Sequence, residues 1–281
     1  MQTVAFQGER GAYSEAAAIE YFDADIEPVP CSSFDSVFDS VTTGACDQGI
    51  VPVENSLAGS IHRNYDLLQR HALTIVGEKV FRVRHCLIAH PGVQRAAIRK
   101  IISHPQALAQ CEGYIDRLRV AREPWYDTAG AVKSLAESGH RDHAAIASRR
   151  AAEVYSMQIL DEGIEDIQAN YTRFLILARE AAAPQAGAEK TSILFSLPQG
   201  GTTPGSLFRA MGAFALRDIN LTKIESRPLP GETFEYVFYL DFEGSYLDPN
   251  CARALEHLRE LAPNVRVLGS YTRDDDWQQT A

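Results

Sequence analysis

Four segments in the first two thirds of the chain combine an expected strand end with an expected helix start. In each, an apolar run ends in small polar residues where a helix should begin. They are Glu54-Asn55-Ser56, Ser103-His104-Pro105-Gln106, Asp127-Thr128-Ala129-Gly130 and Ala147-Ser148-Arg149. A helix N-terminus presents free N–H groups and partial positive charge, and ligands of open α/β sheets bind at the carboxyl ends of strands. One such segment is ordinary N-capping, but four predict a small ligand with several negative charges.

Other residues that often carry chemistry give weaker signals. The turn Gly8-Glu9-Arg10-Gly11 fits neither the dinucleotide nor the P-loop spacing, so a tight turn near a ligand is the better interpretation. Capping or packing explains His104 as well as catalysis does. The pattern around Thr172, taken alone, is explained by a residue that enters a strand. The eight histidines form no metal-binding pair with nearby carboxylates, so no metal site is expected.

Composition narrows the possible functions. With 281 residues and a hydrophobic fraction of 45%, the chain should fold into about two domains. The net charge of -10 and the lack of a Lys/Arg run argue against a nucleic-acid partner. The five cysteines are widely spaced without a C-x-x-C, which favours reduced, buried thiols. No apolar stretch reaches ~18 residues and no signal-peptide pattern begins the sequence, so no membrane partner and a cytoplasmic location are expected.

The elements that must position these segments alternate between strand and helix up to about residue 180. This alternation predicts α/β layers with a largely parallel sheet. Apolar spacing in 34–41 predicts a helix with Ser33 as its N-cap. The runs 74–89 and 170–178 should carry the chain to a second lobe and back, with a cleft between the lobes. Further expected strands are 4–7, 50–53, 100–102, 118–121 and 144–147, and further expected helices are 107–114, 128–137 and 149–155.

A change of composition at 180–189 marks the end of this region. The stretch is rich in alanine and contains Pro184 and Gly187, which is typical of a linker. Beyond it, the order of expected elements is β-α-β-β-α-β, that of a ferredoxin-like module. The strands are 191–197, 220–226, 236–242 and 265–271, the helices are 207–216 and 251–261, and a turn is expected at Pro230-Gly231.

Taken in order, these segments resemble the prephenate dehydratases over nearly the whole chain. The matching runs are 6–15, 51–56 with 59–60, 103–111, 126–130, 145–148 and Asn170-Tyr171-Thr172-Arg173-Phe174. The C-terminal module resembles an ACT domain, because Gly205-Ser206-Leu207-Phe208 and Glu225-Ser226-Arg227-Pro228 match the family's phenylalanine-binding segments. Ser206 stands where that motif more often has alanine. No single run is decisive, but the ordered set is highly specific.

The resemblance implies a two-lobed catalytic domain like a type II periplasmic binding protein, followed by a ferredoxin-like (βαββαβ) ACT regulatory domain. The implied catalytic domain is 1–180, with lobe 1 at about 1–78 and 160–180 and lobe 2 at about 79–159. A linker at 181–190 and the ACT domain at 191–275 follow. The chorismate mutase domain fused to some relatives has no room here, so a monofunctional enzyme is expected.

The implied reaction is the decarboxylation of prephenate with loss of its ring hydroxyl, which yields phenylpyruvate for L-phenylalanine synthesis. Aromatisation drives it, so no cofactor is expected, and a hydrogen-bond donor or general acid would assist departure of the hydroxyl. Two alternatives stay open. The stretch 60–68 looks more like the arogenate dehydratases, whose substrate carries an amine in place of the keto group. A non-catalytic protein that binds small anions could also use the two-lobed fold.

The resemblance also assigns residues to roles. The family's essential threonine falls on Thr172, the expected hydrogen-bond donor. The other expected catalytic residues are Asn55, Ser103 and Gln110. The expected substrate-binding residues are Glu54, Ser56, Thr128, Ser148, Arg173 and Phe174, with Ser56, Thr128 and Ser148 added from the helix-start argument. The expected phenylalanine-binding residues are Gly205, Ser206, Leu207, Phe208, Asn220, Leu221, Glu225, Ser226, Arg227 and Pro228. ACT domains of this family pair side by side, so a homodimer or homotetramer inhibited by L-phenylalanine is expected.

Overall fold

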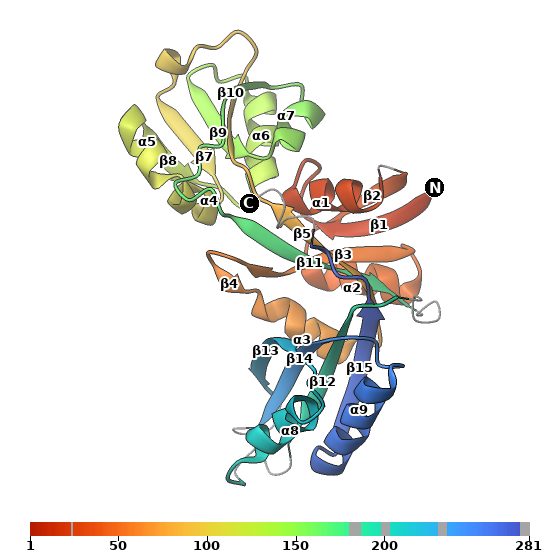
Figure 1. Ribbon diagram of the computed structural model, residues 1–281. Helices are drawn as coiled ribbons and strands as arrows, with labels where there is room; N and C mark the ends of the chain where they lie inside the picture. Colours follow the sequence, from red (N-terminus) through yellow and green to blue (C-terminus); the bar gives the residue numbers. More distant parts are fainter. Residues whose placement is uncertain (24, 180–186, 198–202, 230–234, 276–281) are drawn as a thin grey trace.

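Three β-sheets follow one another along the long axis of the molecule (Figure 1). The computed structural model describes residues 1–23, 25–179, 187–197, 203–229 and 235–275. The six-stranded sheet lies in the middle, a five-stranded sheet lies at one end, and a four-stranded sheet at the other. Within the described part of the chain, no helix is both long and apolar enough to cross a membrane.

The first lobe is built on the middle sheet, with strand order β2-β1-β3-β11-β5 and the short β4 paired to β3. Its strands are β1 (Gln2–Gln7), β2 (Ile26–Cys31), β3 (Gln48–Asn55), β4 (Gly59–Ser60), β5 (Thr74–Arg82) and β11 (Tyr171–Ala178), and its helices are α1 (Tyr13–Tyr21), α2 (Phe34–Thr43) and α3 (His62–Arg70). The predicted N-cap of α2 is confirmed, because the backbone N of Ser36 donates to Oγ of Ser33 at 3.2 Å.

The second lobe is built on the five-stranded sheet, with strand order β10-β6-β9-β7-β8. Its strands are β6 (Cys86–Ala89), β7 (Lys100–Ser103), β8 (Ala121–Pro124), β9 (His143–Ala147) and β10 (Gln158–Glu162), and its helices are η1 (Arg95–Ala97), α4 (Pro105–Gln110), α5 (Glu112–Leu118), α6 (Thr128–Ser138) and α7 (Arg149–Val154). All five cysteines of the chain are buried and unpaired, which confirms the expectation of free thiols.

The prediction of a largely parallel sheet is wrong for both lobes. In the first, β1 is parallel to β2 and β3, but β11 lies between β3 and β5 and is antiparallel to both. In the second, β7 is parallel to β8 and β9, whereas β6 is antiparallel to β9 and β10. The reason is the double crossing: the chain leaves the first lobe through β5 and returns through β11, and the two strands pair side by side in opposite directions.

Two predicted elements of the second lobe also differ. The expected helix 107–114 is split into α4 and α5 at Cys111, whose φ of -117° and ψ of 21° are not helical. The expected strand 118–121 lies too early, because α5 continues to Leu118 and ends at Arg119, which is left-handed with φ 56°. β8 therefore begins only at Ala121.

The expected lobe boundaries fall inside strands. The boundary at 78–79 lies within β5, which pairs with β11 as far as Arg82, and the boundary at 159–160 lies within β10, which pairs with β6. Residues 180–186 of the expected linker region and the turn at Pro230-Gly231 lie outside the described residues.

The two lobes are joined on one side by a close backbone contact. Gly11, with φ +92°, precedes α1, and a Cβ there would lie 2.6 Å from Cα of Ala151 in α7. Oγ of Ser148 donates to the carbonyl of Gly11 at 2.5 Å. Only glycine permits both this left-handed conformation and this approach. Apolar residues of both lobes, including Phe6 and Val132, form one continuous core around the contact.

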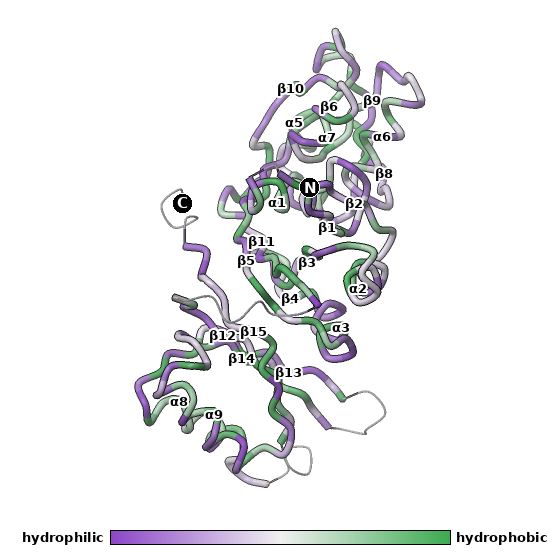
Figure 2. Tube along the Cα trace, turned by 90° about the vertical axis from the view of Figure 1, so that its right-hand side faces the viewer, coloured by the Kyte–Doolittle hydropathy of each residue, from purple (hydrophilic) through white to green (hydrophobic). Residues whose placement is uncertain are grey.

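The C-terminal domain is an antiparallel sheet with order β13-β14-β12-β15. Its elements are β12 (Lys190–Ser196), α8 (Ser206–Ala215), β13 (Leu221–Pro228), β14 (Tyr236–Glu243), α9 (Pro249–Leu261) and β15 (Asn264–Tyr271). This is the predicted β-α-β-β-α-β order. Figure 2 shows α8 and α9 on the side of the sheet that faces away from β5 and β11.

The C-terminal domain shares a hydrophobic core with the first lobe. Leu194, Tyr239 and Leu268 on one face of its sheet pack in the same cluster as Leu175 of β11. The backbones also meet closely, because a Cβ at Gly269 of β15 would lie 2.0 Å from the carbonyl oxygen of residue 75 in β5. The C-terminal domain is therefore packed directly against the strands that connect the two lobes.

Candidate active site

A cavity of about 560 Å³ lies between the two lobes, at the ends of β3 and β11. Four helices begin at its wall: α1 at Tyr13, α2 at Phe34, α4 next to His104 and α6 at Thr128. Their first-turn N–H groups and partial positive charge suit a ligand with several carboxylates. Among the described residues that line this cavity, none is lysine or arginine, so backbone and neutral side-chain donors dominate.

Only two of the four predicted helix starts contribute to this wall. The segments 103–106 and 127–130 begin α4 and α6 at the cavity. Residues 54–56 end a strand that turns into β4, and 147–149 begin α7 at a different cavity. The turn before α1 was expected near a ligand, and Tyr13 at the start of that helix lines the cavity. The start of α2 was missed as a ligand-binding element, although its N-cap Ser33 was a visible signal.

Asn55 and Thr172 face each other across β3 and β11 at the cavity wall. Nδ2 of Asn55 donates to Oγ1 of Thr172 at 3.0 Å and to the carbonyl oxygen of Tyr171 at 3.1 Å, and its two hydrogens are shared between these acceptors and Oδ1 of Asn170. Oδ1 of Asn55 accepts the backbone N–H groups of Leu57 and Ala58 at 3.1 and 2.9 Å, which fixes the orientation of the amide. Because Thr172 accepts this bond, its own O–H is directed elsewhere, and no described residue accepts it. The hydroxyl is thus a spare donor at the cavity wall.

A chain of hydrogen bonds continues behind this pair. Asn55 also donates to Oδ1 of Asn170 at 2.8 Å, and Nδ2 of Asn170 donates to Oε1 of Gln110 at 3.2 Å. Oε1 of Gln110 lies 2.8 Å from Nε2 of His85, and Nδ1 of His85 lies 2.7 Å from the hydroxyl of Tyr13. Because Oε1 only accepts, Nε2 of His85 carries the proton and Nδ1 accepts from Tyr13.

The ionisation states of this chain follow from burial. Burial lowers the pKa of His85 below its ordinary 6.5 and outweighs the opposing bond to Gln110, so the imidazole is neutral. Burial raises the pKa of Tyr13 well above 10.0, so the phenol stays a donor. Burial also raises the pKa of Asp127, which caps α6 by accepting the N–H of Gly130 at 2.8 Å. The sequence patterns gave no signal for His85, and Asn170 stood in the matching run 170–174 without being assigned a role.

Of the predicted site residues, five line this cavity and five do not. Asn55, Gln110, Thr128, Thr172 and Phe174 line it. The structure does not bring Ser103, Ser56, Ser148, Glu54 and Arg173 into its wall.

The three serines have structural partners instead. Oγ of Ser103 is fully buried and donates to the carbonyl of Ile146 at 2.5 Å, which ties β7 to β9. Oγ of Ser56 donates to the carbonyl of Ala169 and accepts the N–H of Tyr171, both at 3.0 Å. Ser148 caps α7 and bonds to the α1 turn. These contacts give the serines structural roles and do not support the direct roles assigned to them.

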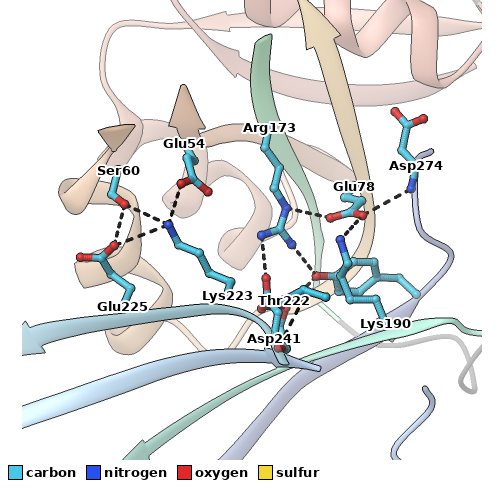
Figure 3. Close-up of polar contacts among 12 residues, drawn as sticks. Glu54, Ser60, Glu78, Arg173, Lys190, Thr222, Lys223, Glu225, Asp241 and Asp274 are labelled. Atoms are coloured by element: carbon cyan, nitrogen blue, oxygen red, sulfur yellow. Dashed lines mark hydrogen bonds and ion pairs between the residues drawn. The ribbon is translucent and has the colours of Figure 1, made fainter. Parts of the chain in front are cut away.

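Glu54 and Arg173 point to the opposite side of the strand pair, toward the C-terminal domain (Figure 3). Oε1 of Glu54 lies 2.9 Å from Nζ of Lys223 on β13. Nη1 of Arg173 lies 2.6 Å from Asp241 on β14, and its Nε lies 2.7 Å from Glu78 on β5. A role in substrate binding is therefore not supported for either residue.

Two further features lie outside this site. A second cavity of about 580 Å³ behind the crossing strands is lined by Ser148 and by several cations, including Arg82, Arg84 and Arg150. Near the protein surface, the potential metal ligands His140, Asp142 and His143 have donor atoms within 4.8 Å of one another. The spacing of histidines in the sequence did not indicate this group.

The predicted phenylalanine-binding residues belong to two elements of the C-terminal domain. Gly205 is left-handed with φ 76° and caps α8, whose first turn holds Ser206, Leu207 and Phe208. The remaining residues are Asn220, Leu221, Glu225, Ser226, Arg227 and Pro228, at the start of β13 and along it. Within one chain, Glu225 bonds to Ser60 at 2.6 Å and Arg227 to Asp66 at 3.0 Å, so both contact the first lobe.

Comparison with known proteins places the chain in a family. The family model for prephenate dehydratase matches residues 4–182. An arogenate dehydratase/prephenate dehydratase of Arabidopsis thaliana is 51% identical over 96% of this chain and 73% of its own length. The structure of prephenate dehydratase from Arthrobacter aurescens in complex with L-Phe superposes with a TM-score of 0.89 at 33% identity, covering 97% of this chain and 90% of that one.

A second solved structure, described as GqqA, a novel type of quorum quenching acylase, has a TM-score of 0.91 at 35% identity and covers 98% of this chain and all of its own. The cytoplasmic location expected from the sequence is wrong by these comparisons, because this plant relative and others from Arabidopsis thaliana are chloroplastic. With a family model that matches most of the two-lobed region, the chain belongs to the prephenate dehydratase family, a family of lyases in phenylalanine biosynthesis.

Proposed function

We propose that the chain converts prephenate to phenylpyruvate in the cavity between the lobes. The observation that carries this proposal is the pair formed by Asn55 and Thr172. Hydrogen bonds to both the oxygen and the nitrogen of the Asn55 amide fix its orientation. The amide in turn orients the Thr172 hydroxyl, whose O–H stays available at the cavity wall. Such a preorganised donor stabilises negative charge that develops on a leaving oxygen.

The proposed reaction breaks two bonds of the substrate ring. The C–C bond to the ring carboxylate breaks and carbon dioxide leaves, while its electron pair forms a new ring double bond. The C–O bond on the far side of the ring breaks, and hydroxide leaves with the electrons of that bond. The ring becomes aromatic, which drives both steps. The helix starts at Tyr13, Phe34 and Thr128 are available to hold the two carboxylates before reaction.

The role of Thr172 is hydrogen-bond donation, and the departing hydroxide becomes water with a proton from solvent. A threonine hydroxyl is a weak acid, so it would need a proton supply to act as a full general acid. The chain behind it is unsuited to that task, because the carboxamides of Asn170 and Gln110 stand between Thr172 and the imidazole of His85. Amide groups orient their neighbours but do not readily pass a proton along.

Arogenate is the second candidate substrate, and one feature of the cavity favours it. The carboxylates of Asp35 and Asp127 are part of the cavity wall, and the ammonium group of arogenate could pair with either. Two relatives from Arabidopsis thaliana are named arogenate dehydratase/prephenate dehydratase, which covers both substrates. The keto group of prephenate would gain nothing from these carboxylates.

The test is to incubate the full chain with each substrate and measure the product. Phenylpyruvate is expected from prephenate and phenylalanine from arogenate, and the two kcat/KM values give the preference. Binding of both substrates without any product would contradict the enzyme proposal in favour of the non-catalytic anion-binding alternative.

We further propose that the C-terminal domain, 191–275, is an ACT domain that binds L-phenylalanine and inhibits the 1–180 domain. The relative from Arthrobacter aurescens is described in complex with L-Phe. Pairing of chains through this domain is supported by exposed apolar side chains, since Phe208 in α8 is 78% exposed and Leu216, the C-cap residue of α8, is 79% exposed. The edge strand β13 also carries Ile224, 43% exposed. Analytical ultracentrifugation with and without phenylalanine should show a dimer or tetramer, and a monomer at micromolar concentration would contradict this pairing.

A further inference from the structure

The strand pair that carries the proposed catalytic residues has a second polar pair one residue further along. Thr172 faces Asn55, and the next register partners are Arg173 and Glu54. The first pair bonds at the cavity wall, whereas the second pair points to the C-terminal domain. A shift of the β3 backbone at Glu54 or of the β11 backbone at Arg173 would therefore also shift the neighbouring residue at the cavity.

Lys223 of β13 forms the contact on the β3 side. Its Nζ lies 2.9 Å from Glu54, 3.6 Å from Glu225 and 3.1 Å from Oγ of Ser60. The side chains of Lys223 and Glu225 are only 14% and 18% exposed, so water screens that contact weakly, whereas Glu54 is 37% exposed and its contact with the lysine is screened more. Glu225 also bonds to Ser60, which pairs with Glu54 across β3 and β4. One strand of the C-terminal domain thus holds the end of β3 immediately before Asn55.

Arg173 forms the contact on the β11 side. Its guanidinium bonds to Glu78, to Asp241 and, at 3.0 Å, to the hydroxyl of Tyr271. Lys190 of the first strand of the C-terminal domain completes the group by pairing with Glu78. Figure 3 shows the two contacts side by side. Glu78 is fully buried, so its charge requires both cations.

We propose that Lys223 and Arg173 are positioning residues for the reaction, through which the C-terminal domain sets the distance between Asn55 and Thr172. This inference rests on the proposed function, and it adds the route by which that domain acts. Lys223 is on the strand of the expected phenylalanine-binding residues 225–228, so a ligand there would bear directly on the contact with Glu54. Coupling of this kind requires that the ligand bind two arrangements of this contact with different affinity.

The proposal is tested with the full chain and three variants. Lys223→Met removes the charge but keeps most of the apolar stem, and Lys223→Arg restores the charge. Lys100→Met is the matched control, because Lys100 pairs with Glu123 at 2.8 Å in the second lobe, far from the C-terminal domain. For each protein, kcat, KM and the concentration of phenylalanine that halves the rate are measured on the better substrate.

Lys223→Met should lower kcat about tenfold at unchanged KM, because small misplacements of reacting groups cost up to ~100-fold. The half-inhibitory phenylalanine concentration should rise at least ~5-fold, the lower limit of typical allosteric coupling. Lys223→Arg should recover most of both effects, and Lys100→Met should change neither.

Two results would overturn the proposal and can be told apart. Lys223→Met with wild-type kcat and wild-type inhibition contradicts the positioning role while leaving the proposed function intact. A wild-type chain that turns over neither substrate contradicts both. The first conclusion also holds if the melting temperature of Lys223→Met is reduced without any kinetic change, because that indicates a purely structural contact.

Discussion

The two faces of the β3–β11 strand pair satisfy their polar groups in different ways. On the cavity face, Asn55 and Thr172 are neutral, and the threonine keeps one donor unused. On the opposite face, Glu54 and Arg173 are charged and paired with residues of the C-terminal domain. An unused hydrogen-bond donor can stabilise a leaving group in the cavity. Charged groups that are fully paired instead hold the first lobe and the C-terminal domain together. In this strand pair, the proposed catalytic residues and the residues that contact the C-terminal domain are therefore neighbours in the sequence.

The charged face should be the costlier one to disturb. Burial opposes the positive charge of Arg173, but Asp241, Tyr271 and Glu78 outweigh it and raise the pKa of the guanidinium well above its ordinary value. Arg173→Met leaves two buried carboxylates without this partner and should lower the free energy of unfolding by about 3–5 kcal/mol in urea titrations.

Arg122 provides the matched control for that measurement. It also pairs with two acids, Glu112 at 3.0 Å and Asp116 at 2.7 Å, but it is 41% exposed. Arg122→Met should cost only about 0–1 kcal/mol. Equal losses in the two variants would contradict the distinction between the faces.

The cavity face should show its effect in rate rather than stability. Asn55→Ala removes the donor that orients Thr172, so kcat should fall about 100-fold with little change in KM. Ser103→Ala is the comparison, because among the described groups the Ser103 hydroxyl bonds only to the carbonyl of Ile146. It should lower the melting temperature and leave kcat within about threefold. A larger kcat loss for Ser103→Ala than for Asn55→Ala would restore Ser103 to the catalytic set.

The smallest effect concerns pH and His85. Its pKa is lowered, so the folded state holds the imidazole neutral while the unfolded chain takes up a proton below 6.5. The contribution to stability is complete above pH 6.5 and declines as pH falls, by at most about 1.4 kcal/mol per pH unit. His85→Gln should remove this slope from urea titrations at pH 5 to 7, and an unchanged slope would assign it to another group.

The sequence predicted much of the fold because periodicity and turn residues are local signals. The helix at 34–41, the β-α-β-β-α-β order and the start of α6 at Thr128 all follow from patterns within a few residues. The mixed sheets did not follow, because β11 pairs with β3 across more than 100 residues of chain. Strand direction in such a pairing has no local signature.

A β-bulge explains why the sequence could not assign Glu54 and Asn55 to the correct faces. Pro52 lines the cavity, so regular alternation would place Glu54 on the same face and Asn55 on the other. The register with β11 instead shifts by one residue between Arg173 and Phe174. The extra residue in β3 turns Asn55 toward Thr172 and Glu54 toward Lys223. Side-chain direction at this point depends on a partner strand that the local pattern does not contain.

The most direct test of the account is the comparison of Thr172→Val with Thr172→Ser. Valine keeps the shape of threonine without the hydroxyl, and serine keeps the hydroxyl. Thr172→Val should lower kcat by about 10²–10³-fold at nearly unchanged KM and melting temperature, while Thr172→Ser stays within about tenfold of wild type. A Thr172→Val enzyme that keeps kcat within about threefold of wild type would contradict the role of the hydroxyl as the spare donor.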